Sequence, residues 1–151
     1  MSYLYKALTA EQIQTHLHVA RHAVVGTITE DGRAQLNTVW FLYEDGMVWL
    51  SWFNWSNKYA NLLRDGRICL CIPTAYGDGD RQVIIYGNVN RDGMIEQGQP
   101  GYNEELDYRM TQQYSKTEEL ARTTHDGDAK DGPWVQISFM PDRIIGDNYD
   151  C

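Results

Sequence analysis

Short apolar runs separated by Asp-Gly pairs constrain the fold of this chain more than any other feature. Asp31-Gly32 and Asp45-Gly46 each join two such runs, and this pairing is typical of tight hairpin turns because glycine tolerates a positive φ. The pattern predicts antiparallel strands over 23–29, 34–43, 47–53, 68–72, 83–90 and 134–140, with a short extra strand at 143–145.

Helices are expected at the periphery of these strands. Thr9 and Gln12 form a capping box ahead of a short amphipathic helix that runs to about Ala20. A second helix is predicted over Lys58–Arg64, and apolar residues every fourth position predict a helical region over 103–122. The polar, acidic segment 123–132 and the Gly- and Asp-rich segment 74–80 are predicted to be surface loops.

The length of 151 residues is that of one domain, so residues 1–151 are expected to form a single unit. The order of elements predicts a mainly β protein with peripheral helices, arranged as an antiparallel barrel. The run Met47–Phe53 is apolar on both faces up to Ser51 and therefore needs a second covering surface. A subunit partner is the expected supplier of that surface.

Charge and cysteine content narrow the classes of function. A net charge of −8 argues against nucleic acid and anionic membranes as partners, because both attract cationic surfaces. No apolar run is long enough to span a membrane, and the first residues lack a signal-peptide pattern. Cys69 and Cys71 alternate along one strand and are interpreted as reduced, buried thiols. The chain is therefore expected to be cytoplasmic.

The segment Ser56-Asn57-Lys58 is the most informative candidate for a binding site. It joins the end of a predicted strand to the start of a predicted helix, where free backbone N–H groups favour an anion. Lys58 adds a full positive charge, and Arg64 adds another about two turns later. From these residues alone, a phosphate site and a plain helix cap with solvated basic residues both remain open.

Two longer segments resemble the split-barrel flavin and deazaflavin proteins. These include the pyridoxamine 5′-phosphate oxidase-related proteins and the reductases that depend on the deazaflavin coenzyme F-420. Residues 25–41 are similar to the first hairpin of that family. Ser56-Asn57-Lys58, Asn61-Leu62 and Arg64-Asp65-Gly66-Arg67 resemble its Lys…Asn-Leu…Arg-Asp element, and residues 141–146 resemble its C-terminal strand and turn.

The resemblance implies a set of cofactor-binding residues. Lys58 matches the family lysine that grips the cofactor phosphate, while Ser56 stands where the family often has a basic residue. Asn57 and Arg64 are candidates to compensate for that missing charge. Asn37, Thr38 and Val39 match the strand segment that lines the ring, and Ser51 and Trp52 match the end of the next strand, near the ribityl chain. No catalytic acid or base is predicted.

The resemblance further implies a homodimeric oxidoreductase with FMN or the deazaflavin coenzyme F-420 at the subunit interface. The cofactor would supply the redox chemistry for a small conjugated substrate. The alternative is a module that binds a cofactor, a tetrapyrrole or haem without turnover. Trp40, Trp55 and Tyr86 are candidates for stacking or substrate contact, although such residues more often belong to a core or an interface.

Other signals are interpreted as structural. His18 and His22 lie four residues apart but lack a third ligand, so no metal site is expected. Asp126, Asp128 and Asp131 resemble part of a calcium loop, yet no glutamate closes it, and a solvated acidic loop is the better interpretation.

Overall fold

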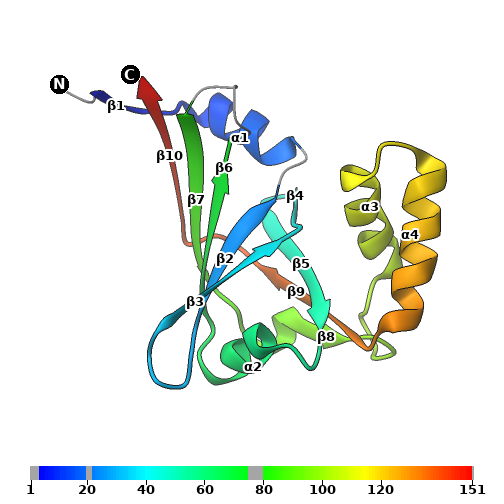
Figure 1. Ribbon diagram of the computed structural model, residues 1–151. Coiled ribbons are helices and arrows are strands. Elements are labelled where there is room, and N and C mark those ends of the chain that lie inside the picture. Colours follow the sequence, from blue (N-terminus) through cyan, green and yellow to red (C-terminus); the bar gives the residue numbers. More distant parts are fainter. Residues whose placement is uncertain (1–3, 20–21, 75–79, 151) are drawn as a thin grey trace.

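The structure is a computed structural model that describes residues 4–19, 22–74 and 80–150. Its strands form two antiparallel sheets, as Figure 1 shows. The larger sheet has the order β1 (Leu4–Ala7), β10 (Arg143–Asp150), β7 (Asp80–Asn88), β6 (Arg67–Pro73), β2 (Ala23–Ile28) and β3 (Ala34–Val39). The smaller sheet has the order β4 (Leu42–Glu44), β5 (Met47–Phe53), β9 (Trp134–Phe139) and β8 (Met94–Glu96). The predicted mainly β barrel is confirmed.

Four helices accompany the sheets in the described residues: α1 (Ala10–His18), α2 (Asn57–Arg64), α3 (Glu104–Tyr114) and α4 (Glu118–Asp131). A 3₁₀ turn covers Arg91–Gly93. The capping box of Thr9 and Gln12 is formed as predicted at the start of α1. No helix of the described residues is both long enough and apolar enough to cross a membrane.

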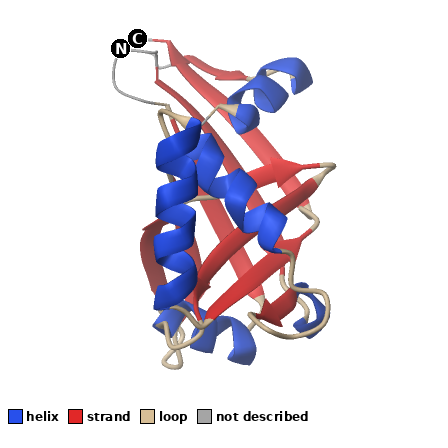
Figure 2. Cartoon of the chain, turned by 90° about the vertical axis from the view of Figure 1, so that its right-hand side faces the viewer, coloured by secondary structure: helices blue, strands red, loops and turns tan. Residues whose placement is uncertain are grey.

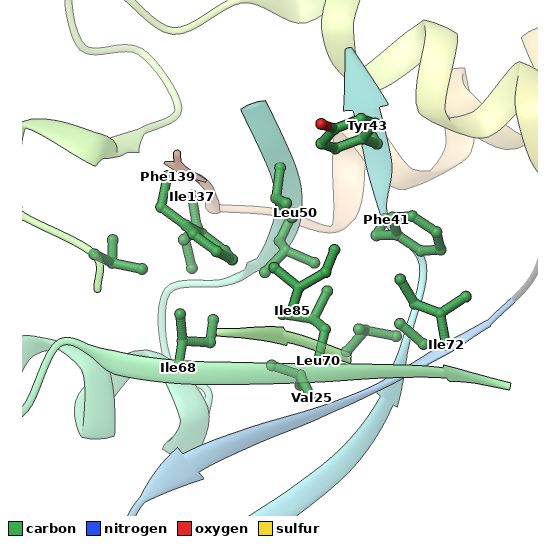
Figure 3. Packing of buried hydrophobic residues seen from close by; sticks show 14 of the residues in the cluster. Val25, Phe41, Tyr43, Leu50, Ile68, Leu70, Ile72, Ile85, Ile137 and Phe139 are labelled. Atoms are coloured by element: carbon green, nitrogen blue, oxygen red, sulfur yellow. The ribbon is translucent and has the colours of Figure 1, made fainter. Parts of the chain in front are cut away.

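The hydrophobic core lies between the two sheets. Leu70 and Ile85 from the larger sheet face Leu50 and Ile137 from the smaller one, as Figure 3 shows, and all four are fully buried. Alternation along each strand turns every second side chain inward, so the period-two pattern of the sequence is what builds this core. The two predicted hairpin turns are present, with positive φ at Gly32, Asp45 and Gly46.

The single strand predicted over 34–43 is wrong. The chain leaves the larger sheet after Val39 and enters the smaller sheet at Leu42, so β3 and β4 belong to different sheets. Phe41 is fully buried at this crossing, and the Tyr114 hydroxyl lies 3.1 Å from both its N–H and its C=O. The Tyr114 side chain of α3 thus bonds with the Phe41 backbone groups, which have no neighbouring strand to pair with. A local sequence pattern cannot reveal such a long-range contact.

The predicted surface loop over 123–132 is also wrong, because this segment forms most of α4. Thr117 caps the helix by accepting a hydrogen bond from the Leu120 N–H, and Arg122 pairs with Glu118 one turn earlier. Ala121 is fully buried where α4 packs on α3. Tertiary packing outweighs the polar composition of the segment. The loop expected over 74–80 lies, apart from Thr74 and Asp80, outside the described residues.

Helix α3 of the same chain supplies part of the covering surface of β5, and a covering partner remains a prediction. Leu106 and Met110 of α3 pack with Leu42 in a second small core, against which Trp49 of β5 also packs. Figure 2 shows α3 and α4 side by side over this part of the sheets. The strand predicted over 143–145 is longer than expected, because β10 pairs with both β1 and β7.

Candidate functional site

A cavity of about 490 Å³ lies where the two sheets separate. The register of β4 with β5 ends at Trp49, so the last residues of β5 have no strand beside them on that edge. β3 is the edge strand of the other sheet. Edge strands leave backbone N–H and C=O groups without ladder partners. The helices α3 and α4 contribute the opposite wall of this cavity.

The fold brings five of the nine predicted site residues together on the cavity wall: Thr38, Val39, Ser51, Trp52 and Lys58. They come from β3, β5 and the first turn of α2. These elements meet at the cavity because the two sheets separate there. Trp40, one of the predicted stacking residues, also lines the cavity and stacks on Tyr114 with ring centroids 4.8 Å apart.

The other four predicted residues do not line the cavity. Asn37 accepts a hydrogen bond from the Gln35 side chain, at 2.9 Å. Ser56 caps α2 by accepting from the Tyr59 N–H, and Asn57 is exposed. Arg64 is exposed and donates to the Ala60 carbonyl and to the Asn61 side chain.

Two of the proposed stacking residues also lie elsewhere. Trp55 is exposed and stacks on Phe53, and Tyr86 is on the outer face of the larger sheet. Cys69 and Cys71 are free and half-buried rather than in the core, and burial raises the pKa of both thiols. Among the described residues no group of three His, Cys, Asp or Glu side chains could hold a metal ion.

Lys58 is the cation whose surroundings most clearly fit an anionic ligand. It is half-buried, and burial lowers its pKa from the ordinary value of 10.5. Its Nζ lies 5.1 Å from the centre of the Trp52 ring, and it forms no ion pair with any described carboxylate. A partly desolvated ammonium without a counter-ion is costly, and a phosphate at the start of α2 would provide that counter-ion.

Trp52 provides a second indication of a bound ligand, because its buried indole N–H lacks a hydrogen-bond acceptor in the described residues. The Trp52 side chain is 4% exposed. Buried donors are nearly always bonded, so an orphan on a cavity wall indicates an acceptor supplied by a ligand. Ring carbonyls and nitrogens of a flavin or deazaflavin are acceptors of this kind, so the residues present fit such a group.

The wall contributed by α3 and α4 was missed from the sequence. Tyr102, Glu104, Asp107, Thr111 and His125 line the cavity although they lie far along the chain from Lys58. Burial and the hydrogen bond to Asp107 raise the pKa of Tyr102 strongly, so its phenol stays protonated. The only local signal was the acidic start of α3, which ordinary helix capping explains equally well.

Comparisons with known proteins agree with this fold. The sequence model of a family described as pyridoxamine 5′-phosphate oxidase matches residues 9–104. No curated protein matches the chain.

Solved structures share the fold at low identity. A conserved hypothetical protein of Mycobacterium tuberculosis is 22% identical, with a TM-score of 0.70 over 93% of this chain and 85% of that one. An F-420 reductase is 17% identical, with a TM-score of 0.67 over 87% of this chain and 94% of that one. A haem storage protein of Vibrio cholerae is 11% identical, with a TM-score of 0.67 over 93% and 95%.

Proposed function

Because the chain belongs to the pyridoxamine 5′-phosphate oxidase family of split-barrel proteins, we propose that it is a cytoplasmic oxidoreductase that uses FMN or the deazaflavin coenzyme F-420. The observation that carries the proposal is Lys58, which is half-buried at the wall of a cavity between two open strand edges and pairs with no carboxylate of the described residues. The substrate is a small conjugated molecule that enters the same cavity.

The residues of the chain bind and orient, and the bound cofactor would supply the hydride or electron transfer. Lys58 would hold the phosphate, and the Trp52 N–H would donate to an acceptor on the ring. Thr38, Val39 and Ser51 would line the ring and its side chain from β3 and β5. Asn37, Ser56, Asn57 and Arg64 remain predictions that rest on the family resemblance.

Cofactor loading tests the proposal directly. We expect the purified protein to bind FMN or coenzyme F-420, seen as quenched or shifted cofactor absorbance and fluorescence during titration. Riboflavin, which has the same ring as FMN but no phosphate, should bind distinctly more weakly. Failure of both phosphorylated cofactors to bind would contradict the proposal.

A tetrapyrrole-binding module is the second candidate, because two histidines line the cavity. His22 and His125 are candidate axial ligands, although His22 already accepts a hydrogen bond from Trp40 at 3.0 Å. Haem titration of the His22→Ala and His125→Ala variants separates the two functions. Loss of a haem Soret shift in either variant, with no flavin binding in the parent protein, would favour the module.

We also propose a homodimer that uses the outer face of the larger sheet. The strand registers align Leu36, Gly26, Cys69 and Tyr86 in one row across four strands. Leu36 is 66% exposed and Tyr86 41% exposed, which leaves an apolar row open to water. Since Thr38 of the same strand lines the cavity, a partner on this face would also adjoin the cofactor site.

Sedimentation velocity measures this association. We expect a dimer for the parent protein and a monomer for Leu36→Glu, because the new charge would be buried in the interface. Met140→Glu is the matched control, since Met140 is equally exposed at 68% but lies outside that row. A parent protein that is monomeric at micromolar concentration would contradict the proposed dimer.

A further inference from the structure

Asp107 of α3 lines the same cavity as Lys58 and carries the opposite charge. Its Oδ1 accepts a hydrogen bond from Gln136 Nε2 at 2.9 Å, and its Oδ2 accepts one from the Tyr102 hydroxyl. Both donors are neutral, and no described cation pairs with Asp107. A carboxylate has about four acceptor positions, so two remain for another donor.

The two donors are themselves fixed. Gln136 is 3% exposed, and its amide bonds to both backbone groups of Asn103, with its nitrogen on the carbonyl and its oxygen on the N–H. Because the Asn103 N–H can only donate, the Gln136 amide cannot reverse. Tyr102 stays protonated, and a hydrogen bond links it to Ser51 of β5. The Asp107 carboxylate is therefore held in one orientation on a rigid support.

The charges of the cavity are separated across β5. Ser51, which contacts Tyr102, and Trp52, under Lys58, are adjacent and so face opposite sides of the strand. Glu104 also lines the cavity and raises the pKa of Tyr102, so it adds to the negative side. The cavity thus has a cationic side at Lys58 and an anionic side at Asp107.

Stacked aromatic rings also line the cavity. Phe53 and Trp134 both line it, and their rings stack at 4.2 Å. Flat, aromatic walls favour flat ligands, and they favour cationic ones in particular.

Helix capping alone does not account for Asp107. Glu105, in the same first turn of α3, is exposed and can interact with the helix dipole without lining the cavity. Asp107 differs because it lines the cavity and is held there by two donors. The orphan N–H of Trp52 lies on the Lys58 side of the same cavity and indicates that a ligand enters the cavity there.

We propose that Asp107 selects the substrate, and that the substrate is a flat aromatic compound with a positively charged or N–H-bearing nitrogen. This rests on the proposed function, in which the cofactor takes the Lys58 side of the cavity. The Asp107 carboxylate accepts a charge-assisted hydrogen bond from the substrate nitrogen, while Tyr102 and Gln136 position that carboxylate.

Proflavine, a planar tricyclic cation with N–H donors, is the probe, and its fluorescence reports binding. We expect its Kd to rise about tenfold in Asp107→Asn, the effect of losing one charged hydrogen bond. Glu105→Gln removes the same charge from the same helical turn and should change the Kd less than twofold. Acridine-9-carboxylate, the anionic counterpart, should bind Asp107→Asn as tightly as the parent protein or more tightly, which also shows that the variant is folded.

Three results would overturn the inference. If Asp107→Asn and Glu105→Gln weaken proflavine binding equally, the effect comes from the overall negative charge of α3 rather than from a contact with Asp107. Weakening of both probes alike by Asp107→Asn would show that Asp107 does not select a positively charged ligand, and an unchanged proflavine Kd would show that Asp107 does not contact the ligand.

An FMN titration of the same proteins separates this inference from the proposed function. If the parent protein binds neither FMN nor coenzyme F-420, the proposed function fails while the proflavine comparison still decides the role of Asp107. If FMN binding falls tenfold in Asp107→Asn, then Asp107 belongs to the cofactor site and the substrate inference is wrong.

Discussion

Replacing Lys58 with methionine is expected to weaken FMN binding by about 1.5–3 kcal/mol, which is the usual value of a hydrogen bond to a charged group. Methionine keeps an apolar stem over the Trp52 ring, so the change isolates the loss of the ammonium from the loss of packing. Riboflavin affinity should be almost unchanged, because riboflavin has no phosphate to hold. Isothermal titration of both ligands measures the difference.

The pH dependence gives this prediction a second signature. Burial lowers the pKa of Lys58 below 10.5, so the ammonium loses its proton at a lower pH than an ordinary lysine does. The protonated form binds phosphate, and FMN affinity should therefore fall as the pH rises through that lowered pKa. Lys58→Arg should remain insensitive over the same range, because a guanidinium stays charged.

Lys116 provides the control for charge alone. It is an exposed lysine between α3 and α4, so Lys116→Met makes the same chemical change far from the proposed phosphate grip. FMN affinity should change less than twofold in that variant. If Lys58→Met lowers FMN and riboflavin affinity equally, Lys58 does not hold the phosphate and the site assignment is wrong.

Gly87→Ala is expected to destabilise the fold by about 2–3 kcal/mol, at the upper end of the usual range for overpacking a core. Gly87 lies in β7, and an added Cβ would come within 2.3 Å of Cδ2 of Phe139. Phe139 is 3% exposed and belongs to the other sheet, so its ring has little room to move. Urea denaturation at a fixed protein concentration measures the change in the free energy of unfolding.

Gly127→Ala is the matched comparison, because no atom of the described residues outside its own helical turn lies within 4 Å of a Cβ at that position of α4. It should stabilise the protein by up to about 1 kcal/mol, since alanine is the better helix former. Gly87→Ala combined with Phe139→Leu should recover part of the lost stability, which a double-mutant cycle detects. Equal stability of the Gly87→Ala and Gly127→Ala variants would contradict the proposed clash.

Much of the fold could be predicted from the sequence because its signals are local. The turns at Gly32 and Gly46, the capping box at Thr9 and the alternation along β5 each depend on residues close in the chain. The family resemblance added the phosphate-binding role of Lys58 and the residues expected to line the ring. The predicted residues that line the cavity are those of β3, β5 and the start of α2, the segments from which the resemblance was drawn.

Local pattern alone thus determined where strands and turns form and which lysine to suspect, because period and turn chemistry act over a few residues. The tertiary structure decided the rest. The crossing at Phe41 depends on Tyr114, and the cavity wall depends on α3 and α4 packing beside β5. Tyr102 and Ser51 are 51 positions apart in the chain, and only the packing of the helices against the open edge of the barrel brings them into contact. A long-range contact of this kind leaves no periodic trace in the sequence.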